Sequence, residues 1–205
     1  MYIPKLFAAK DDIEAYNFMK QYSFATIVTS FNNVPTATHL PFTITKRNDQ
    51  LILTSHFAKA NPQWKKIAEN RVLVIFTEPH AYISPKHYDN QISVPTWNYI
   101  AVHAYGQGKI ISNQKQAFDV LENMIDTYDA DYKKQWEGLP EDYKLKMLNG
   151  IVAFEVNVTE LQTTKKLSQN KTQVEQQRII NALLASSDGT ERDLAAFMQV
   201  NLKQS

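Results

Sequence analysis

The chain has no cysteine, only five glycines among its 205 residues, and no long apolar run. Without cysteine it cannot form a disulfide, a thiolate zinc site, an iron–sulfur cluster or a cysteine nucleophile. The scarcity of glycine disfavours a glycine-rich phosphate loop, and neither a Gly-x-Gly-x-x-Gly nor a Walker sequence occurs. No run approaches the roughly 18 apolar residues of a membrane span, and the first residues lack the apolar segment of a secretory signal. We therefore expect a cytoplasmic protein without a membrane segment.

An excess of one charge sign is also missing. The 22 Lys and Arg residues are balanced by 21 Asp and Glu residues, for a net charge of +1. Proteins dedicated to nucleic acid usually carry a clearer basic excess, so the overall composition gives no support to DNA binding. Hydrophobic residues make up 43% of the chain and aromatic residues 11%. This composition is typical of a folded domain with a full core.

The hydrophobic pattern predicts both helices and strands. We expect a helix over 12–21 with Asp11 as its cap, and further helices from about 113, over 141–149, and within 172–201, where Thr190 and Asp193 resemble a capping box. β-branched or alternating runs predict strands at 23–30, 34–45, 51–55, 72–77, 81–84, 96–106 and 151–158. Pro35 and Pro41 break the run over 34–45 and suggest edge or bulged positions there. These elements predict an α+β fold in which six or seven mostly antiparallel strands form a small barrel with peripheral helices.

Segment 53–64 combines residue types that bind phosphate. A strand ends in the hydroxyls of Thr54 and Ser55, His56 and Lys59 follow, and Asn61-Pro62 opens a short helix. Hydroxyls, an ammonium group and free backbone N–H groups are what a phosphate needs. The alternative is a polar loop in which Asn61 is only a helix cap, and spacing alone favours this alternative.

Segment 94–106 is rich in aromatic residues. On a strand, Trp97, Tyr99, His103 and Tyr105 point to one side, while Asn98 points to the other. The aromatic side predicts a stacking surface for a flat heterocycle or a dimer interface, and the alternative is an aromatic stripe in the core. Asn98 would need hydrogen-bond partners in a dry core. The histidines lack the spacing of a zinc motif and no Gly-x-Ser-x-Gly occurs, so we expect no metal site and assign no catalytic residue.

Six blocks, in the same order along the chain, carry a family resemblance. They are Met1–Lys5, His39–Pro41, His56-x-Ala58-x-x-Asn61-Pro62-x-Trp64, Tyr82-Ile83-Ser84-Pro85-x-x-Tyr88, Val94–His103 and Lys166–Asn170. Together they resemble the PaiB-like family of FMN-binding negative transcriptional regulators. The resemblance implies a split β-barrel like that of pyridoxamine-phosphate-oxidase-type flavoproteins over residues 1–170, with a C-terminal helical extension over 171–205 packed on the barrel. It also implies a homodimer with FMN in clefts between the subunits.

The resemblance further implies where FMN binds. The strand-to-helix loop would hold the phosphate, Trp97 and Asn98 would lie near the isoalloxazine, and Gln169 would come from the partner subunit. Thr38 stands where the wider fold normally has an arginine, which removes a bidentate phosphate contact and implies weak FMN binding. The implied cofactor-binding residues are Thr38, His39, Thr54, Ser55, His56, Lys59, Asn61, Trp97, Asn98 and Gln169.

Three functions are compatible with these features. The resemblance favours negative transcriptional regulation by an FMN-binding homodimer. The first alternative is a flavin-dependent oxidoreductase on the same fold, with His56, His103 or Tyr82 as proton donor, although no acid–base pair stands at a diagnostic spacing. The second is direct DNA binding through the C-terminal helices. Segment 163–205 holds six basic and four acidic residues, a small excess for neutralising phosphates.

Overall fold

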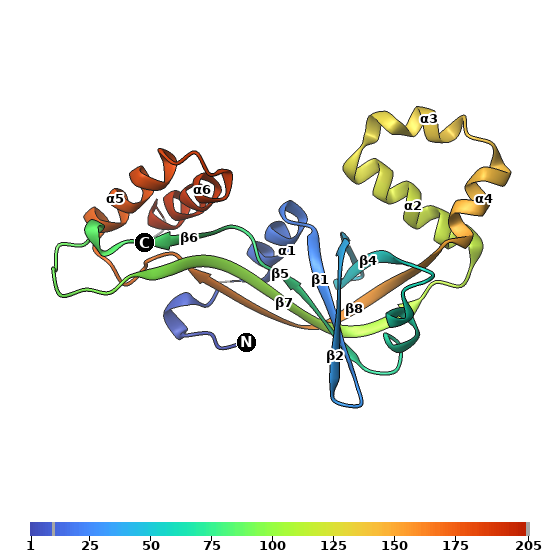
Figure 1. The fold of residues 1–205 in the computed structure, drawn as a ribbon, viewed down its shortest axis with the longest axis horizontal. Coiled ribbons are helices and arrows are strands. Elements are labelled where there is room, and N and C mark those ends of the chain that lie inside the picture. Colours follow the sequence, from blue (N-terminus) through green and yellow to red (C-terminus); the bar gives the residue numbers. More distant parts are fainter. Residues whose placement is uncertain (10, 204–205) are drawn as a thin grey trace. The chain divides into compact units, whose positions relative to one another are not determined.

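The computed structural model describes residues 1–9 and 11–203 (Figure 1). The chain divides into two compact units. The first unit comprises residues 1–15, 77–102 and 162–205, and the second comprises residues 16–76 and 103–161. The long strands β7 (Thr96–Ile110) and β8 (Ile151–Lys166) contribute residues to both. The boundary expected at residue 170 stays a prediction, and residues 204–205 of the expected C-terminal extension lie outside the described residues.

Eight strands form one sheet in the order β2-β1-β5-β7-β8-β4-β3, and β6 (His80–Ile83) pairs with β7. The other strands are β1 (Phe24–Phe31), β2 (Val34–Pro41), β3 (Thr43–Arg47), β4 (Gln50–Ala58) and β5 (Arg71–Phe76). The pairs β1–β2, β1–β5, β3–β4, β4–β8 and β6–β7 are antiparallel. Because β2 also contacts β4, near the other end of the order, the sheet of the second unit curls towards a barrel. The α+β fold expected from the sequence is confirmed.

Two tight turns shape the barrel strands. Asn32 and Asn33 join β1 to β2 with φ of 50° and 63°, and Asn48 and Asp49 join β3 to β4 with φ of 48° and 63°. Asn and Asp tolerate this left-handed backbone, which matches the twist of hairpin strands. The hairpin expected at 32–33 is therefore confirmed, and β2 with its two prolines is an edge strand of the sheet, as expected.

The run expected over 34–45 forms two strands, and the break follows Pro41, one of the two prolines expected to interrupt it. It is split into β2 and β3 at Phe42, whose backbone N–H continues the β1–β2 register by donating to Ser23 O at 2.9 Å. The split places the Phe42 ring in the core, where it is fully buried and meets Phe76 and Phe154 edge-on with centroids 6.1 Å apart. Burial of this large ring accompanies the break, and the sheet has eight strands instead of the six or seven expected.

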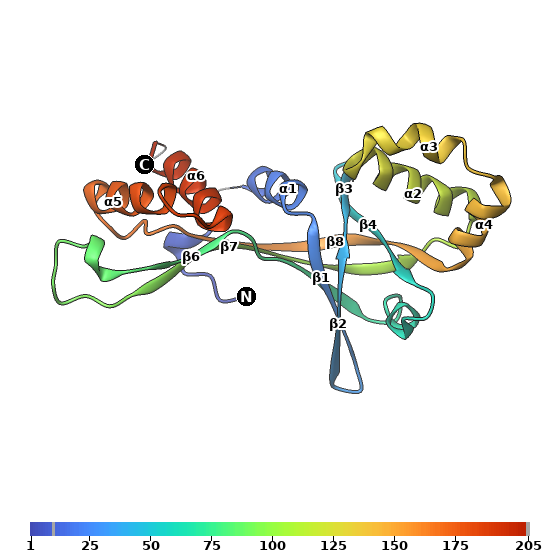
Figure 2. The ribbon, with the colours of Figure 1, turned by 45° about the horizontal axis from the view of Figure 1, so that its top comes forward.

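Three helices of the second unit pack together between β7 and β8 in the sequence (Figure 2). They are α2 (Gln114–Tyr128), α3 (Lys133–Glu137) and α4 (Glu141–Asn149), with the 3₁₀ turn η4 (Ala130–Tyr132) before α3. Asn113 caps α2 by accepting from Gln116 N at 3.0 Å. Buried side chains of α2 pack with Leu148 of α4 and Ala153 of β8. The sequence predicted α2 and α4 but not α3.

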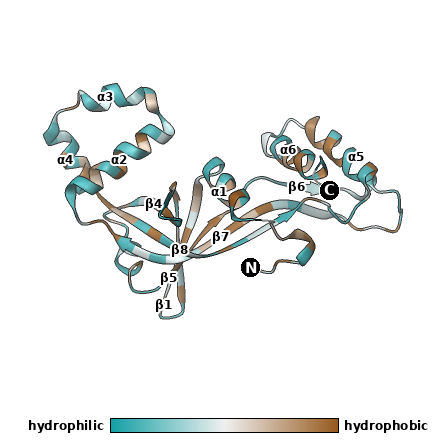
Figure 3. Ribbon diagram, turned by 180° about the vertical axis from the view of Figure 1, so that it is seen from behind, coloured by the Kyte–Doolittle hydropathy of each residue, from teal (hydrophilic) through white to brown (hydrophobic). Residues whose placement is uncertain are grey.

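The first unit carries α5 (Gln173–Leu184) and α6 (Gly189–Lys203), which pack against each other through apolar faces (Figure 3). Thr172 and Glu175 form a capping box at the start of α5, and the Glu175 carboxylate also accepts from Asp89 N at 2.9 Å. The capping box expected at Thr190 was wrong, because α6 begins at Gly189 and Asp188 Oδ1 accepts from the backbone N–H of Thr190 at 2.8 Å.

The N-terminal helix matches its expectation. It runs as α1 (Asp12–Gln21), and Asp11 Oδ1 accepts from Ile13 N and Glu14 N, both at 2.9 Å. Three further 3₁₀ turns are η1 (Lys5–Phe7), η2 (Pro62–Lys66) and η3 (Pro85–His87). Among the described residues, no helix combines the length and the apolar character that a membrane crossing requires.

Candidate functional site

Strand β4 carries three consecutive candidate residues, two on one face and one on the other. Thr54 lines a cavity beside β3, and His56 lines a second, apolar pocket. Ser55, between them, is fully buried and its Oγ donates to Pro41 O at 2.7 Å. Because side chains alternate along a strand, Thr54 and His56 share one face and Ser55 lies on the other. The Ser55 hydroxyl therefore ties β4 to the end of β2.

Thr38 and Asn61 meet in a polar network that joins β2 to η2. Asn61 Nδ2 donates to Thr38 Oγ1 at 2.9 Å, and Thr38 Oγ1 donates to Gln63 Oε1 at 2.5 Å. Gln63 is only 4% exposed, and its Nε2 donates to the carbonyls of Ile27 and Thr36 at 3.2 and 3.1 Å. Asn61 Oδ1 accepts from Gln63 N at 3.0 Å, so Asn61 is the helix cap that the alternative interpretation expected. Sequence reasoning missed Gln63, because nothing local marks a glutamine as buried.

His39 and Lys59 are exposed at the surface of the second unit. The backbone at Lys59 is held firmly, since its N–H donates to Gly150 O at 2.8 Å and its carbonyl accepts from Trp64 Nε1 at 3.1 Å. The ammonium group of Lys59 therefore extends from a fixed loop into solvent. Such a group is available to an anion that approaches from outside.

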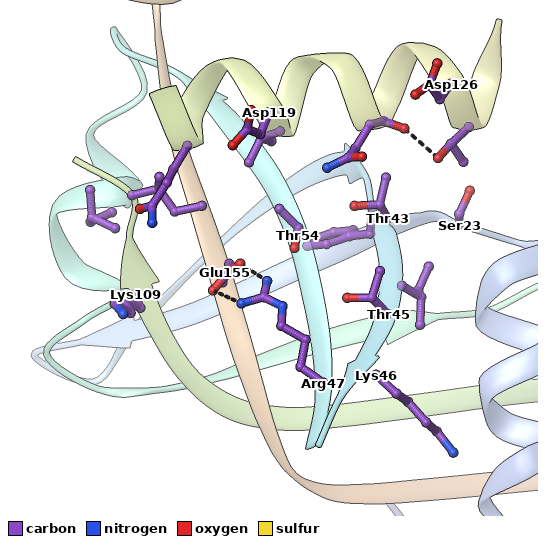
Figure 4. Close-up of a pocket in the computed structure, with 18 of the residues that line it drawn as sticks. Ser23, Thr43, Thr45, Lys46, Arg47, Thr54, Lys109, Asp119, Asp126 and Glu155 are labelled. Carbon is purple, nitrogen blue, oxygen red and sulfur yellow. Dashed lines mark hydrogen bonds and ion pairs between the residues drawn. The ribbon is translucent and has the colours of Figure 1, made fainter. Parts of the chain in front are cut away.

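A cavity of about 820 Å³ lies beside β3 and β4 and is bordered by α2 and the end of β7 (Figure 4). We call it the β3–β4 cavity. Its lining is rich in hydroxyls and charged groups. The hydroxyls belong to Ser23, Thr43, Thr45, Thr54, Ser112 and Thr127, the cations to Lys20, Lys46, Arg47 and Lys109, and the carboxylates to Asp119, Asp126 and Glu155.

Ion pairs neutralise part of this charge. Arg47 pairs with Glu155, and Asp126 pairs with Lys133 at 2.7 Å. Among the residues that the structure describes, the three lysines of the lining form no ion pair and are opposed by one unpaired carboxylate, that of Asp119. The cavity is therefore positive on balance, and hydroxyls of β3 and β4 lie within it.

The β3–β4 cavity has the chemistry to hold the phosphate of FMN. Its volume falls within the range of about 300–1,000 Å³ that is usual for cofactor pockets. Ammonium groups and hydroxyls donate the hydrogen bonds that a phosphate ester accepts best. Thr54, which lines the cavity, belongs to the set of cofactor-binding residues predicted from the sequence. Lys46 and Lys109 were not predicted, because they lie 63 positions apart in the sequence and only the tertiary structure brings them to one cavity.

The remaining candidates belong to the first unit. Asn98 is fully buried, and its Nδ2 donates to Ser168 Oγ at 2.9 Å, so it has the partner that its expected burial requires. Gln169 bonds within its own loop, since its Oε1 accepts from Leu167 N at 2.7 Å and its Nε2 donates to Lys165 O. Trp97 is 53% exposed, and its ring packs edge-on against Tyr82 with centroids 6.1 Å apart. Of these three side chains, Trp97 presents the most surface to a ligand or a partner.

Comparisons with known proteins agree with this picture. The family described as "Putative FMN-binding domain" matches residues 1–160. "Protease synthase and sporulation protein PAI 2" of Bacillus subtilis is 38% identical over 207 residues, covering 100% of this chain and 99% of that protein.

Two solved structures share the fold. The flavocytochrome Anf3 of Azotobacter vinelandii has a TM-score of 0.64 and 14% identity, over 80% of this chain and 72% of that one. The FAD and heme binding protein of Mycobacterium smegmatis has a TM-score of 0.60 and 13% identity, over 77% and 72%. At these identities the likeness concerns the fold alone, and it confirms the predicted split barrel.

Proposed function

Because the chain belongs to the FMN-binding domain family, we propose that it is a negative transcriptional regulator of the PaiB type that works as a homodimer. The membership confirms the family predicted from the sequence and FMN as its cofactor. The regulatory role is supported by the full-length relative, whose name refers to protease synthesis and sporulation. Bound FMN would supply electron-transfer chemistry, while the chain provides binding and orientation.

The positive, hydroxyl-rich β3–β4 cavity is the observation that supports our placement of the FMN site. In our proposal Thr54 and Lys109 hold the FMN phosphate there. The exposed candidates His39 and Lys59 remain contacts for the rest of the cofactor. Trp97, which belongs to the first unit, and His56 keep only the roles that the resemblance implies. The hydrogen-bonded candidates hold the backbone in position, and they are Thr38, Ser55, Asn61, Asn98 and Gln169.

A titration with FMN, followed by flavin fluorescence, tests this site. The Lys109→Ala variant should bind FMN about ten- to a hundredfold more weakly, because it loses a charge-assisted hydrogen bond of about 1.5–3 kcal/mol. Lys115→Ala is the matched control, since Lys115 is an exposed lysine of α2 outside the lining, and its affinity should not change. If Lys59→Ala weakens binding and Lys109→Ala does not, the phosphate lies on the strand-to-helix loop instead. A wild-type protein that does not bind FMN would contradict the proposal altogether.

The homodimer is supported by apolar side chains that the first unit leaves exposed. Ile92 is 92% exposed, Val94 78%, Trp97 53% and Tyr82 49%, and the rings of Trp97 and Tyr82 pack edge-on against each other. Large apolar side chains that meet at an exposed surface are typical of an interaction site. Light scattering during size-exclusion chromatography should give the mass of two chains. A single chain at micromolar concentration would refute the dimer.

The contacts of the C-terminal segment disfavour DNA binding through α5 and α6. Five of its six basic residues already have partners within the first unit. They are Lys165 with Glu14, Lys166 with Thr96, Lys171 over the Tyr88 ring, Arg178 with Asp89, and Arg192 with Ser186 O. We therefore expect no complex with DNA in a low-salt gel shift. A complex that disappears when Lys171, Arg178 and Lys203 are neutralised would restore direct DNA binding.

The regulatory role needs its own experiment. Transcripts of candidate genes should rise in cells that lack the protein and fall again when the wild type is restored. Steady turnover of a nicotinamide donor by the FMN-loaded protein, without any transcript change, would instead favour the oxidoreductase alternative.

A further inference from the structure

The β3–β4 cavity contains an ion pair whose two members lie on different strands. Arg47, the last residue of β3, donates to the Glu155 carboxylate of β8 through both terminal nitrogens, with Nη1 3.4 Å from Oε2. Both residues line the cavity, and Figure 4 shows the pair beside Thr54. The Glu155 side chain is 14% exposed, whereas the Arg47 side chain is 58% exposed. The carboxylate is therefore the more buried member of the pair.

The strand register explains why this carboxylate lies next to Thr54. On β4, Thr54 is directly opposite Thr43 of β3 on one side and Glu155 of β8 on the other. Residues that are directly opposite in an antiparallel pair share a face, and their Cβ atoms lie about 4.5–5.5 Å apart. The hydroxyl to which we assign the FMN phosphate thus has the Glu155 carboxylate as an immediate neighbour.

A phosphate at Thr54 would be close to the negative charge of Glu155. Like charges about 5–6 Å apart repel each other strongly in a partly enclosed cavity, where the effective dielectric constant is lower than in water. The guanidinium of Arg47 carries the opposite charge and holds the carboxylate from two sides. The pair is neutral as a whole, so the repulsion of a phosphate by Glu155 is largely cancelled as long as Arg47 stays in place.

On the basis of the FMN site proposed above, we propose that Arg47 is a positioning residue for the phosphate, and that it acts through Glu155 without contacting the ligand. Lys109 attracts the phosphate directly, whereas Arg47 neutralises the one carboxylate that stands beside Thr54 in the register. The Arg47–Glu155 pair thereby makes the cavity selective for a ligand with a phosphate monoester. With the carboxylate bare, the cavity still accepts an uncharged flavin but repels a phosphorylated one.

FMN and riboflavin test this role, because they differ only in the phosphate. Their affinities are measured by flavin fluorescence for the wild type, Arg47→Ala, Glu155→Gln and the double variant. Arg47→Ala should bind FMN at least about tenfold more weakly and riboflavin as before, since it uncovers one unit of negative charge beside the phosphate. In the double variant no charge remains at either position, so its affinity for FMN should return to within about threefold of the wild type.

Arg71→Ala is the matched control. Arg71 also pairs with a glutamate of β8, Glu160, and its side chain is 52% exposed, but neither residue lines the cavity. Its affinity for FMN should therefore not change. Arg47→Lys keeps the positive charge and should keep most of the affinity for FMN. Should Arg47→Ala fail to fold, Arg47→Gln removes the same charge and is expected to give the same result.

The outcomes separate this role from the FMN site itself. If the wild type prefers FMN to riboflavin but Arg47→Ala keeps that preference, the site stands and the role of Arg47 is refuted. A double variant that binds FMN as weakly as Arg47→Ala also refutes it, because Arg47 would then contact the phosphate or merely support the fold. A wild type that binds riboflavin as tightly as FMN overturns the placement of the phosphate, and the role of Arg47 with it.

Discussion

Gln63 offers the sharpest test of how the candidate loop is held in place. Replacing it by methionine keeps the length and much of the volume of the side chain but removes its amide. The amide Nε2 donates to the buried strand β1 at Ile27 O and to β2 at Thr36 O, and Oε1 accepts from Thr38 Oγ1. Nε2 also donates to the buried Thr29 Oγ1 at 3.2 Å. Because the Thr38 hydroxyl keeps its bond from Asn61, we count the two carbonyl oxygens and the Thr29 hydroxyl as the groups that lose a partner.

The expected loss follows from these contacts. A buried group left without its partner costs about 1–3 kcal/mol, so Gln63→Met should lower the free energy of unfolding by about 3 kcal/mol. For a chain of this length about 2–4 °C of melting temperature correspond to 1 kcal/mol, which predicts a decrease of about 6–12 °C.

Urea unfolding measures this difference, with tryptophan fluorescence and circular dichroism as two independent probes. Gln107→Ala is the control, because Gln107 is exposed and its Nε2 also donates to a carbonyl, Ala68 O, at 2.7 Å. Its effect should stay within about 0.5 kcal/mol. If Gln63→Met is no less stable than Gln107→Ala, the network does not hold η2 to the strands and the reasoning is refuted.

Three further predictions concern packing and pH. Gly106→Ala should destabilise the protein by about 1–3 kcal/mol in thermal unfolding, since its Cβ would lie 2.2 Å from Asn157 O, whereas Gly138→Ala, with 3.6 Å to its nearest neighbour, should be nearly neutral. The two backbone N–H groups that bond the Glu175 carboxylate lower its pKa, so its ionised form stabilises the folded state at pH values above the ordinary pKa of 4.5. In urea unfolding, Glu175→Gln should therefore be less stable than the wild type above this pH, and the difference in free energy of unfolding should shrink as the pH falls below it. A difference that stays constant with pH would contradict this. Burial lowers the pKa of His56, so the unfolded chain takes up a proton at this residue before the folded chain does as the pH falls through about 6.5. Between about pH 7.5 and 5.5 the wild type should therefore lose more free energy of unfolding than His56→Leu. Equal losses in the two proteins would refute the lowered pKa.

Features that depend on a few neighbouring residues were predictable. Helix α1 begins and ends where its cap and apolar pattern indicate, and the hairpin at Asn32-Asn33 has the left-handed backbone that this pair tolerates. The predicted need of Asn98 for a partner is also met, by Ser168. In each case the signal lies in residue type and short spacing, which act before any long-range contact forms.

Features that depend on residues far apart in the sequence were not predictable. The sequence indicated a break at Pro41, but not that the adjacent Phe42 ring would be buried against Phe154, more than a hundred residues away. Within the candidate site the sequence indicated Thr54 and Asn61, but not that Asn61 would bond Thr38 or that Lys109 would join Thr54 at one cavity.

The sequence by itself therefore determined the kinds of element, their turns and the family to which the chain belongs. Only the tertiary structure decided which polar groups are satisfied, which remain orphaned, and which charges collect around a cavity. The physical reason is that hydrogen-bond partners and desolvation depend on distance in space, whereas propensity and capping depend on distance along the chain.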